Sequence, residues 1–70
     1  MIEVYKTDLN DLALAEEIKR IVEQEVQHCK ISFDLEDKDR IMRVQAEPAG
    51  IAAAEELFRL MLVVFEPLPA

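Results

Sequence analysis

The chain has 70 residues, 51% of them hydrophobic, with one glycine and three prolines, so it is not a disordered sequence and fits one small domain, residues 1–70. The formal net charge of -7 argues against nucleic acid and anionic membranes as partners, because both repel an acidic protein. A single cysteine excludes an internal disulfide and fits a reducing compartment. There is neither a secretory leader pattern nor an apolar run near the roughly 20 residues of a membrane span, so we expect a cytoplasmic protein.

The first two predicted elements are a strand and a helix. Residues 2–6 are rich in β-branched and aromatic side chains, which favours a strand, although its buried face is ambiguous. Asp8, Asn10 and Asp11 then supply helix-capping side chains, and residues 11–27 contain no glycine or proline. An apolar residue recurs there every three or four positions, at Leu14, Ile18, Ile21, Val22 and Val26. This spacing predicts an amphipathic helix.

Residues 29–46 have the pattern of two strands joined by an acidic turn. In the first run Cys29, Ile31 and Phe33 alternate with polar residues, and in the second Met42 and Val44 share one face. The turn is too short for any pairing other than antiparallel. Its carboxylates are those of Asp34, Glu36, Asp37 and Asp39. Because the glycine and spacing of a calcium loop are missing, we expect these carboxylates to face solvent.

The last part of the chain is predicted as a second helix and a short closing strand. Pro48 suits the first turn of a helix over residues 49–61. Residues 62–65 either extend this helix or form a strand, and the β-branched Val63 and Val64 favour the strand. The predicted order is βαββα(β). It implies an α+β domain of the ferredoxin-like plait type, with two helices on one face of an antiparallel sheet.

Four short segments resemble the heavy-metal-associated domains, the fold of copper chaperones and of the N-terminal modules of metal-pumping ATPases. Residues 6–9, KTDL, are similar to the end of the first strand of that family. FDLED and DRIMRV, at residues 33–37 and 39–44, are similar to its hairpin, and EPL at residues 66–68 falls where its last strand often ends. The resemblance implies the plait fold over nearly the whole chain.

The resemblance also implies a metal loop, M-x-C-x-x-C, whose two thiolates bind a soft metal at the start of the first helix. Aligning the chain on Lys6 and Thr7 puts Asp11 and Leu14 where those cysteines would stand. Neither side chain replaces a thiolate for Cu(I). We therefore expect a degenerate member of this fold that lacks the CxxC metal loop.

Four residues are weak candidates for metal ligands: Asp8, Asp11, His28 and Cys29. The two aspartates would suit a hard divalent ion, but residues of this type before a helix are more often caps. His28 and Cys29 are the only imidazole and thiol, and adjacent residues of a strand point to opposite faces. That alternation predicts a core cysteine and a solvent-facing histidine. We therefore expect neither a metal site nor a cofactor.

The residues do not form a recognisable catalytic set, so we predict a non-enzymatic binding or accessory domain that acts through protein–protein contacts. The run from Leu57 to Phe65 is apolar except for Arg59, which is more apolar surface than one contact face can bury. We expect a homodimer through this run. The alternative is a metal-ion binding or trafficking protein with an altered site.

Overall fold

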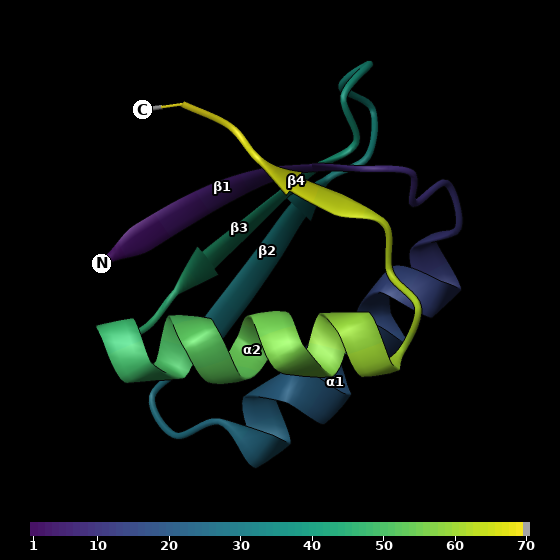
Figure 1. Cartoon of the computed structure of the whole chain (residues 1–70). Helices are drawn as coiled ribbons and strands as arrows, with labels where there is room; N and C mark the ends of the chain where they lie inside the picture. Colours follow the sequence, from purple (N-terminus) through teal and green to yellow (C-terminus); the bar gives the residue numbers. More distant parts are fainter. Residues whose placement is uncertain (70) are drawn as a thin grey trace.

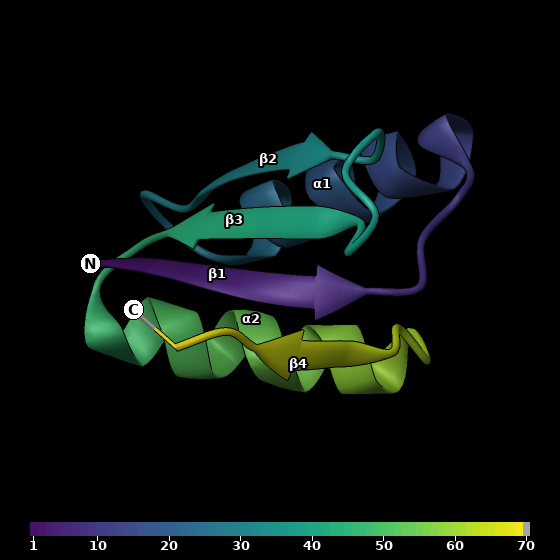
Figure 2. The ribbon, with the colours of Figure 1, turned by 90° about the horizontal axis from the view of Figure 1, so that it is seen from above.

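The computed structural model describes residues 1–69, which form a four-stranded sheet and two helices (Figure 1). The elements are β1 (Ile2–Thr7), α1 (Leu12–Glu25), β2 (Lys30–Asp34), β3 (Ile41–Gln45), α2 (Pro48–Leu60) and β4 (Phe65–Pro67). Both helices lie beneath one face of the sheet, and neither helix covers the opposite face (Figure 2). The predicted α+β class and order of elements are confirmed.

The strand order is β2-β3-β1-β4, and every neighbouring pair is antiparallel. In the predicted hairpin, which is confirmed, Ile31 stands opposite Val44 and Phe33 opposite Met42. Side chains alternate across a strand, so this register places these four apolar residues on the face that the helices cover. On β1, whose buried face the sequence left ambiguous, Tyr5 is the large side chain that faces the core.

The helix α1 is capped as predicted and buries a slightly different stripe. The carboxylate of Asp11 accepts hydrogen bonds from the N–H groups of Ala13 at 2.9 Å and Leu14 at 3.3 Å. The buried residues of α1 are Ala15, Ile18 and Val22. Leu14, which the periodicity assigned to this stripe, is 51% exposed, because Ala15 occupies the buried position in the first turn. The prediction for Leu14 was therefore wrong.

Three aromatic rings join β1, α2 and β4. Tyr5, Phe58 and Phe65 meet edge to face, with ring centroids 5.5 to 6.2 Å apart. Such T-shaped pairs stabilise a core beyond the area they bury. Because Phe65 completes this cluster, it fixes the place where the last strand begins.

The chain leaves α2 through a tight cap at Leu62. The N–H of Leu62 donates to the carbonyl oxygen of Arg59 at 3.0 Å, and that of Val63 donates to Phe58 at 2.9 Å. This is the pattern of a Schellman cap, and Leu62 adopts the left-handed φ of 61° that it requires. The strand predicted for residues 62–65 was therefore misplaced: the cap occupies its start, and β4 begins only at Phe65.

Candidate functional site

The aspartates before α1 act in the structure as surface and capping residues. One oxygen of Asp11 accepts both N–H groups of the first turn, which is the ordinary function of an N-cap. Asp8 is exposed at the entrance to the same helix. The structure therefore supports the capping interpretation of this segment.

The neighbours His28 and Cys29 face different environments. Cys29 is 6% exposed and belongs to the core cluster, while His28 is exposed in the turn after α1 with a φ of 57°. Burial, helped by the nearby charge of Glu23, raises the pKa of the Cys29 thiol. A protonated, buried thiol is a poor nucleophile and a poor metal ligand.

The structure does not gather the candidate ligands. The two aspartates and the His28–Cys29 pair lie at opposite ends of α1, whose 14 residues span about 21 Å. Among residues 1–69, three or more His, Cys, Asp or Glu side chains do not come together in a group that could hold a metal ion. In the acidic turn, Asp37 accepts the N–H of Asp39 at 2.8 Å, so this carboxylate stabilises the turn itself.

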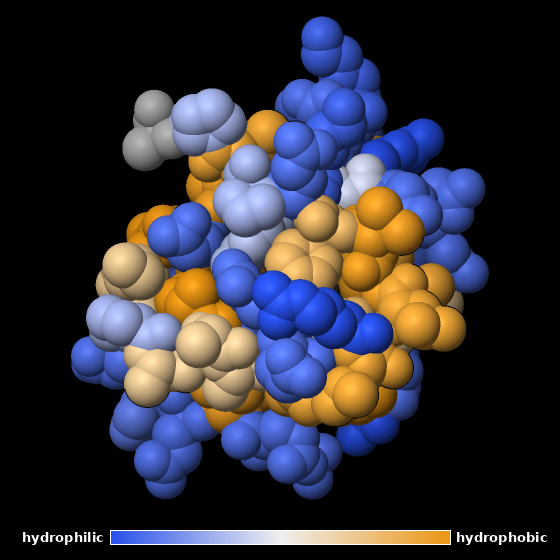
Figure 3. All heavy atoms as spheres, viewed as in Figure 1, coloured by the Kyte–Doolittle hydropathy of each residue, from blue (hydrophilic) through white to orange (hydrophobic). Residues whose placement is uncertain are grey.

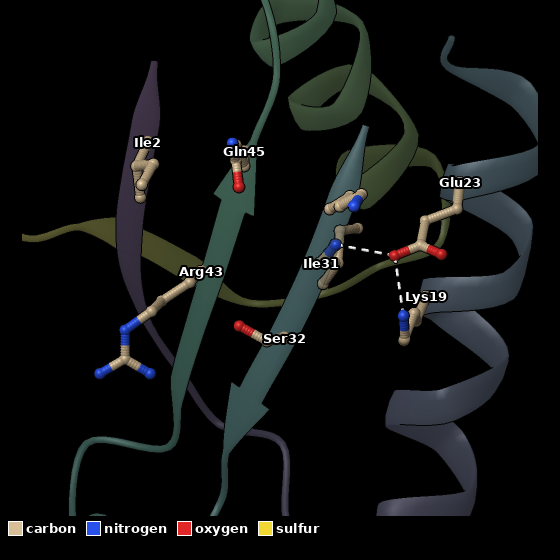
Figure 4. A pocket seen from close by; sticks show the side chains of 8 residues that line it. Ile2, Lys19, Glu23, Ile31, Ser32, Arg43 and Gln45 are labelled. Carbon is tan, nitrogen blue, oxygen red and sulfur yellow. Dashed lines mark hydrogen bonds and ion pairs between the residues drawn. The ribbon is translucent and has the colours of Figure 1, made fainter. Parts of the chain in front are cut away.

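A hollow of about 550 Å³ extends from β1 across β3 and the edge strand β2 to α1 (Figure 4). There the carboxylate of Glu23 accepts hydrogen bonds from the N–H of Ile31 and from the ammonium of Lys19, both at 2.8 Å. Burial alone would raise the pKa of Glu23, but Lys19 and the Ile31 N–H together hold it below its ordinary value. Glu23 thus accepts the hydrogen bond of an N–H on the outer edge of β2, which would otherwise be free to pair with another strand. The sequence pattern does not predict this contact, because it joins a residue of a helix to a residue of a strand.

A second concave feature, the α1–α2 groove, lies between α1 and the connection from α2 to β4. It encloses about 440 Å³. Its lining residues are Asp8, Leu9, Asn10, Leu14, Glu17, Ile18, Ile21, Met61, Leu62 and Val63. Most of these side chains are apolar, and the two charged ones, Asp8 and Glu17, are both acidic.

The α1–α2 groove continues into a wider apolar surface. Figure 3 shows hydrophobic side chains gathered on the side of the molecule where α2 ends and the chain turns toward β4. Leu60, Leu62 and Val64, in this segment, are 70%, 87% and 62% exposed. The sequence indicated an excess of apolar residues between Leu57 and Phe65, and only the structure separates the buried Phe58 from these exposed neighbours.

Comparisons with known proteins do not assign the chain to a family. No protein-family model matches the chain. Searches of curated proteins and of solved structures also found no match. No helix within residues 1–69 is long and apolar enough to cross a membrane.

Proposed function

We propose that this chain is a small non-enzymatic binding domain that acts through protein–protein contacts. The observation that supports this function is the exposed apolar surface at the end of α2, where Leu60, Leu62 and Val64 are each more than half exposed. Contiguous apolar surface of this kind marks interaction sites in folded proteins. The adjoining α1–α2 groove gives this surface a concave shape.

For the fold we propose a ferredoxin-like plait. In support, β3 lies between β1 and β2, and β1 lies between β3 and β4. Each helix therefore connects two strands that are separated by a third, which is the split βαβ arrangement.

For the ancestry we propose a heavy-metal-associated-like domain that has lost its thiolate loop. The resemblance puts the second metal-binding cysteine at Leu14, and Leu14 lines the α1–α2 groove. Asp11, at the first cysteine position, caps α1. On this proposal, the segment that would hold a metal in the family has become one wall of a surface for binding a protein.

The first contact that we propose is a homodimer through the run from Leu57 to Phe65. β4 has three residues and includes Pro67, which lacks an N–H, so its outer edge is a poor template for extending the sheet. The dimer would then form by packing of the exposed side chains of Leu60 and Val64.

Light scattering at tens of micromolar tests this dimer. We expect twice the monomer mass for the native chain and the monomer mass for Leu60→Ser and Val64→Ser. The control is Leu12→Ser, which changes a leucine of similar exposure, 65%, that lies outside both the run from Leu57 to Phe65 and the lining of the α1–α2 groove. A native chain that stays monomeric contradicts the homodimer.

A further inference from the structure

We propose that the α1–α2 groove binds a basic amphipathic helix of a partner protein, an inference that rests on the proposed protein-binding function. Three features of the groove carry it. The floor is apolar, the rim is acidic, and the cap of α2 holds the most exposed apolar residue of the lining at the rim.

The floor of the groove suits the apolar face of a helix. Ile18 is buried at its base, Leu14 stands half exposed on α1, and Met61 and Val63 form the opposite wall. Helix-in-groove recognition uses apolar anchors at positions i, i+3, i+4 and i+7 of the bound helix. A groove with α1 as one wall and a short connection as the other offers such anchors a continuous apolar surface.

The charge of the rim selects the partner. Among residues 1–69, Asp8 and Glu17 are the only charged residues that line the groove, and the whole chain has a formal charge of -7. Glu17 also contacts Arg20, which lies outside the lining. Lysine or arginine residues flanking the apolar face of a partner helix would meet these carboxylates. A second copy of this chain would instead bring two more carboxylates to the same rim, so we assign the groove to a basic partner.

Leu62 is the most exposed apolar residue of the groove lining. Its φ of 61° is a conformation that glycine adopts without strain, and its side chain is 87% exposed. Both the backbone and the exposed apolar side chain are unfavourable in the free monomer. The Schellman cap at the end of α2 holds this backbone and places the exposed leucine at the rim of the groove, where a partner would cover it.

The test uses a fluorescent synthetic peptide of leucine and lysine that forms an amphipathic helix, titrated with the full chain. We expect saturable binding, and we expect Leu62→Gly and Leu14→Ser each to raise Kd at least about tenfold. Leu62→Gly removes the side chain and relieves the backbone, so it folds at least as well as the native chain and cannot lose binding by unfolding. Leu12→Ser, on α1 but outside the groove, should leave Kd unchanged.

A second arm tests the acidic rim. The double variant Asp8→Asn/Glu17→Gln should weaken binding several-fold, while Glu36→Gln/Asp37→Asn, with the same net charge but in the hairpin turn, should not. Raising sodium chloride from about 0.03 M to about 0.3 M, which shortens the Debye length roughly threefold, should also weaken binding. A peptide with glutamate in place of lysine should not bind.

Several outcomes overturn the proposal. A scrambled or acidic peptide that binds as tightly as the basic helix excludes specific recognition, and an unchanged Kd for Leu62→Gly excludes the groove. A dimer that Leu62→Gly dissociates assigns the groove to a second copy, which contradicts this inference but supports the proposed function. A monomeric chain that does not bind the peptide contradicts both.

Discussion

The phenol of Tyr5, on β1, donates a hydrogen bond to the carboxylate of Glu55, on α2, at 2.6 Å. Tyr5 has no solvent exposure, and its ring packs against Phe58 and Phe65. The hydrogen bond therefore gives a buried hydroxyl the partner it needs and fixes α2 relative to the centre of the sheet. Burial first, and then the hydrogen bond and the charge of Glu55, raise the pKa of Tyr5 well above its ordinary value.

This relationship predicts a loss of stability in alkali that Tyr5→Phe removes. In the unfolded chain the phenol ionises near its ordinary pKa of 10.0, while in the folded chain it stays protonated, so unfolding releases a proton above pH 10. Tyr5→Phe should lower the free energy of unfolding by about 1–2 kcal/mol at neutral pH, and the difference should disappear as the pH rises beyond 10. Urea titrations of both chains measure it. If the difference in the free energy of unfolding between the two chains does not change with pH, the fold does not protect the phenol of Tyr5 from ionisation.

Removal of the Glu23 carboxylate should open the outer edge of β2. Glu23→Ala leaves the N–H of Ile31 without its acceptor. We therefore expect the free energy of unfolding to fall by about 1–2 kcal/mol and hydrogen exchange at Ile31 to become faster. Glu23→Gln keeps an acceptor oxygen, so its free energy of unfolding should fall less than that of Glu23→Ala. The folded-state pKa of Glu23 is lowered, so its contribution is present above the unfolded value of 4.5 and is lost as the pH falls below it. Glu25→Ala, exposed at the end of α1, is the control and should change little.

The glycine in the first turn of α2 lies where two elements approach closely. A Cβ added to Gly50 would stand 3.0 Å from the Cβ of Ala46 and 3.3 Å from Cγ1 of Val26. Gly50→Ala should therefore gain none of the roughly 1 kcal/mol that alanine usually adds to a helix, and Gly50→Val should lose about 1–3 kcal/mol. Ala53→Gly, at an exposed position of the same helix, should show the ordinary helix penalty of about 1 kcal/mol. A clear gain for Gly50→Ala in thermal unfolding would contradict this packing.

The cap at the end of α2 predicts opposite effects for two neighbouring leucines. Leu62→Gly relieves the left-handed backbone and should raise the free energy of unfolding by about 1 kcal/mol, or the melting temperature by roughly 4–8 °C. Leu60→Gly, in the helix itself, should lower it. Thermal unfolding followed by circular dichroism checks both signs. Equal effects at the two positions would be inconsistent with the cap.

Experiments on the buried thiol of Cys29 distinguish the proposed protein-binding function from the metal-trafficking alternative. Because Cys29 is buried and its pKa is raised, a thiol reagent should modify it slowly in buffer and quickly in urea. Calorimetric titration with Cu(I), Zn(II) and Ca(II) should give the same heats for the native chain and for Cys29→Ala. A Cu(I) or Zn(II) heat that Cys29→Ala abolishes would favour the metal-trafficking alternative instead.

The sequence by itself determined the elements whose signals are local. The alternation at Ile31 and Phe33, the spacing of Ile18 and Val22, and Pro48 at the start of a helix all depend on contacts within a few residues. Those patterns were sufficient for the element order and for the antiparallel hairpin. They were also sufficient to predict the cap that Asp11 forms.

The tertiary structure alone decided which apolar residues stay on the surface. Leu14 fits the helical period but lies on the border of the buried stripe, and its exposure depends on Ala15 packing beneath the sheet. Leu62 is exposed because the Schellman cap reverses the chain so that Phe65 can join Tyr5 and Phe58. The two leucines, far apart in the sequence, meet at one groove because packing between α1 and the end of α2 brings them together, and periodicity within one element contains no such information.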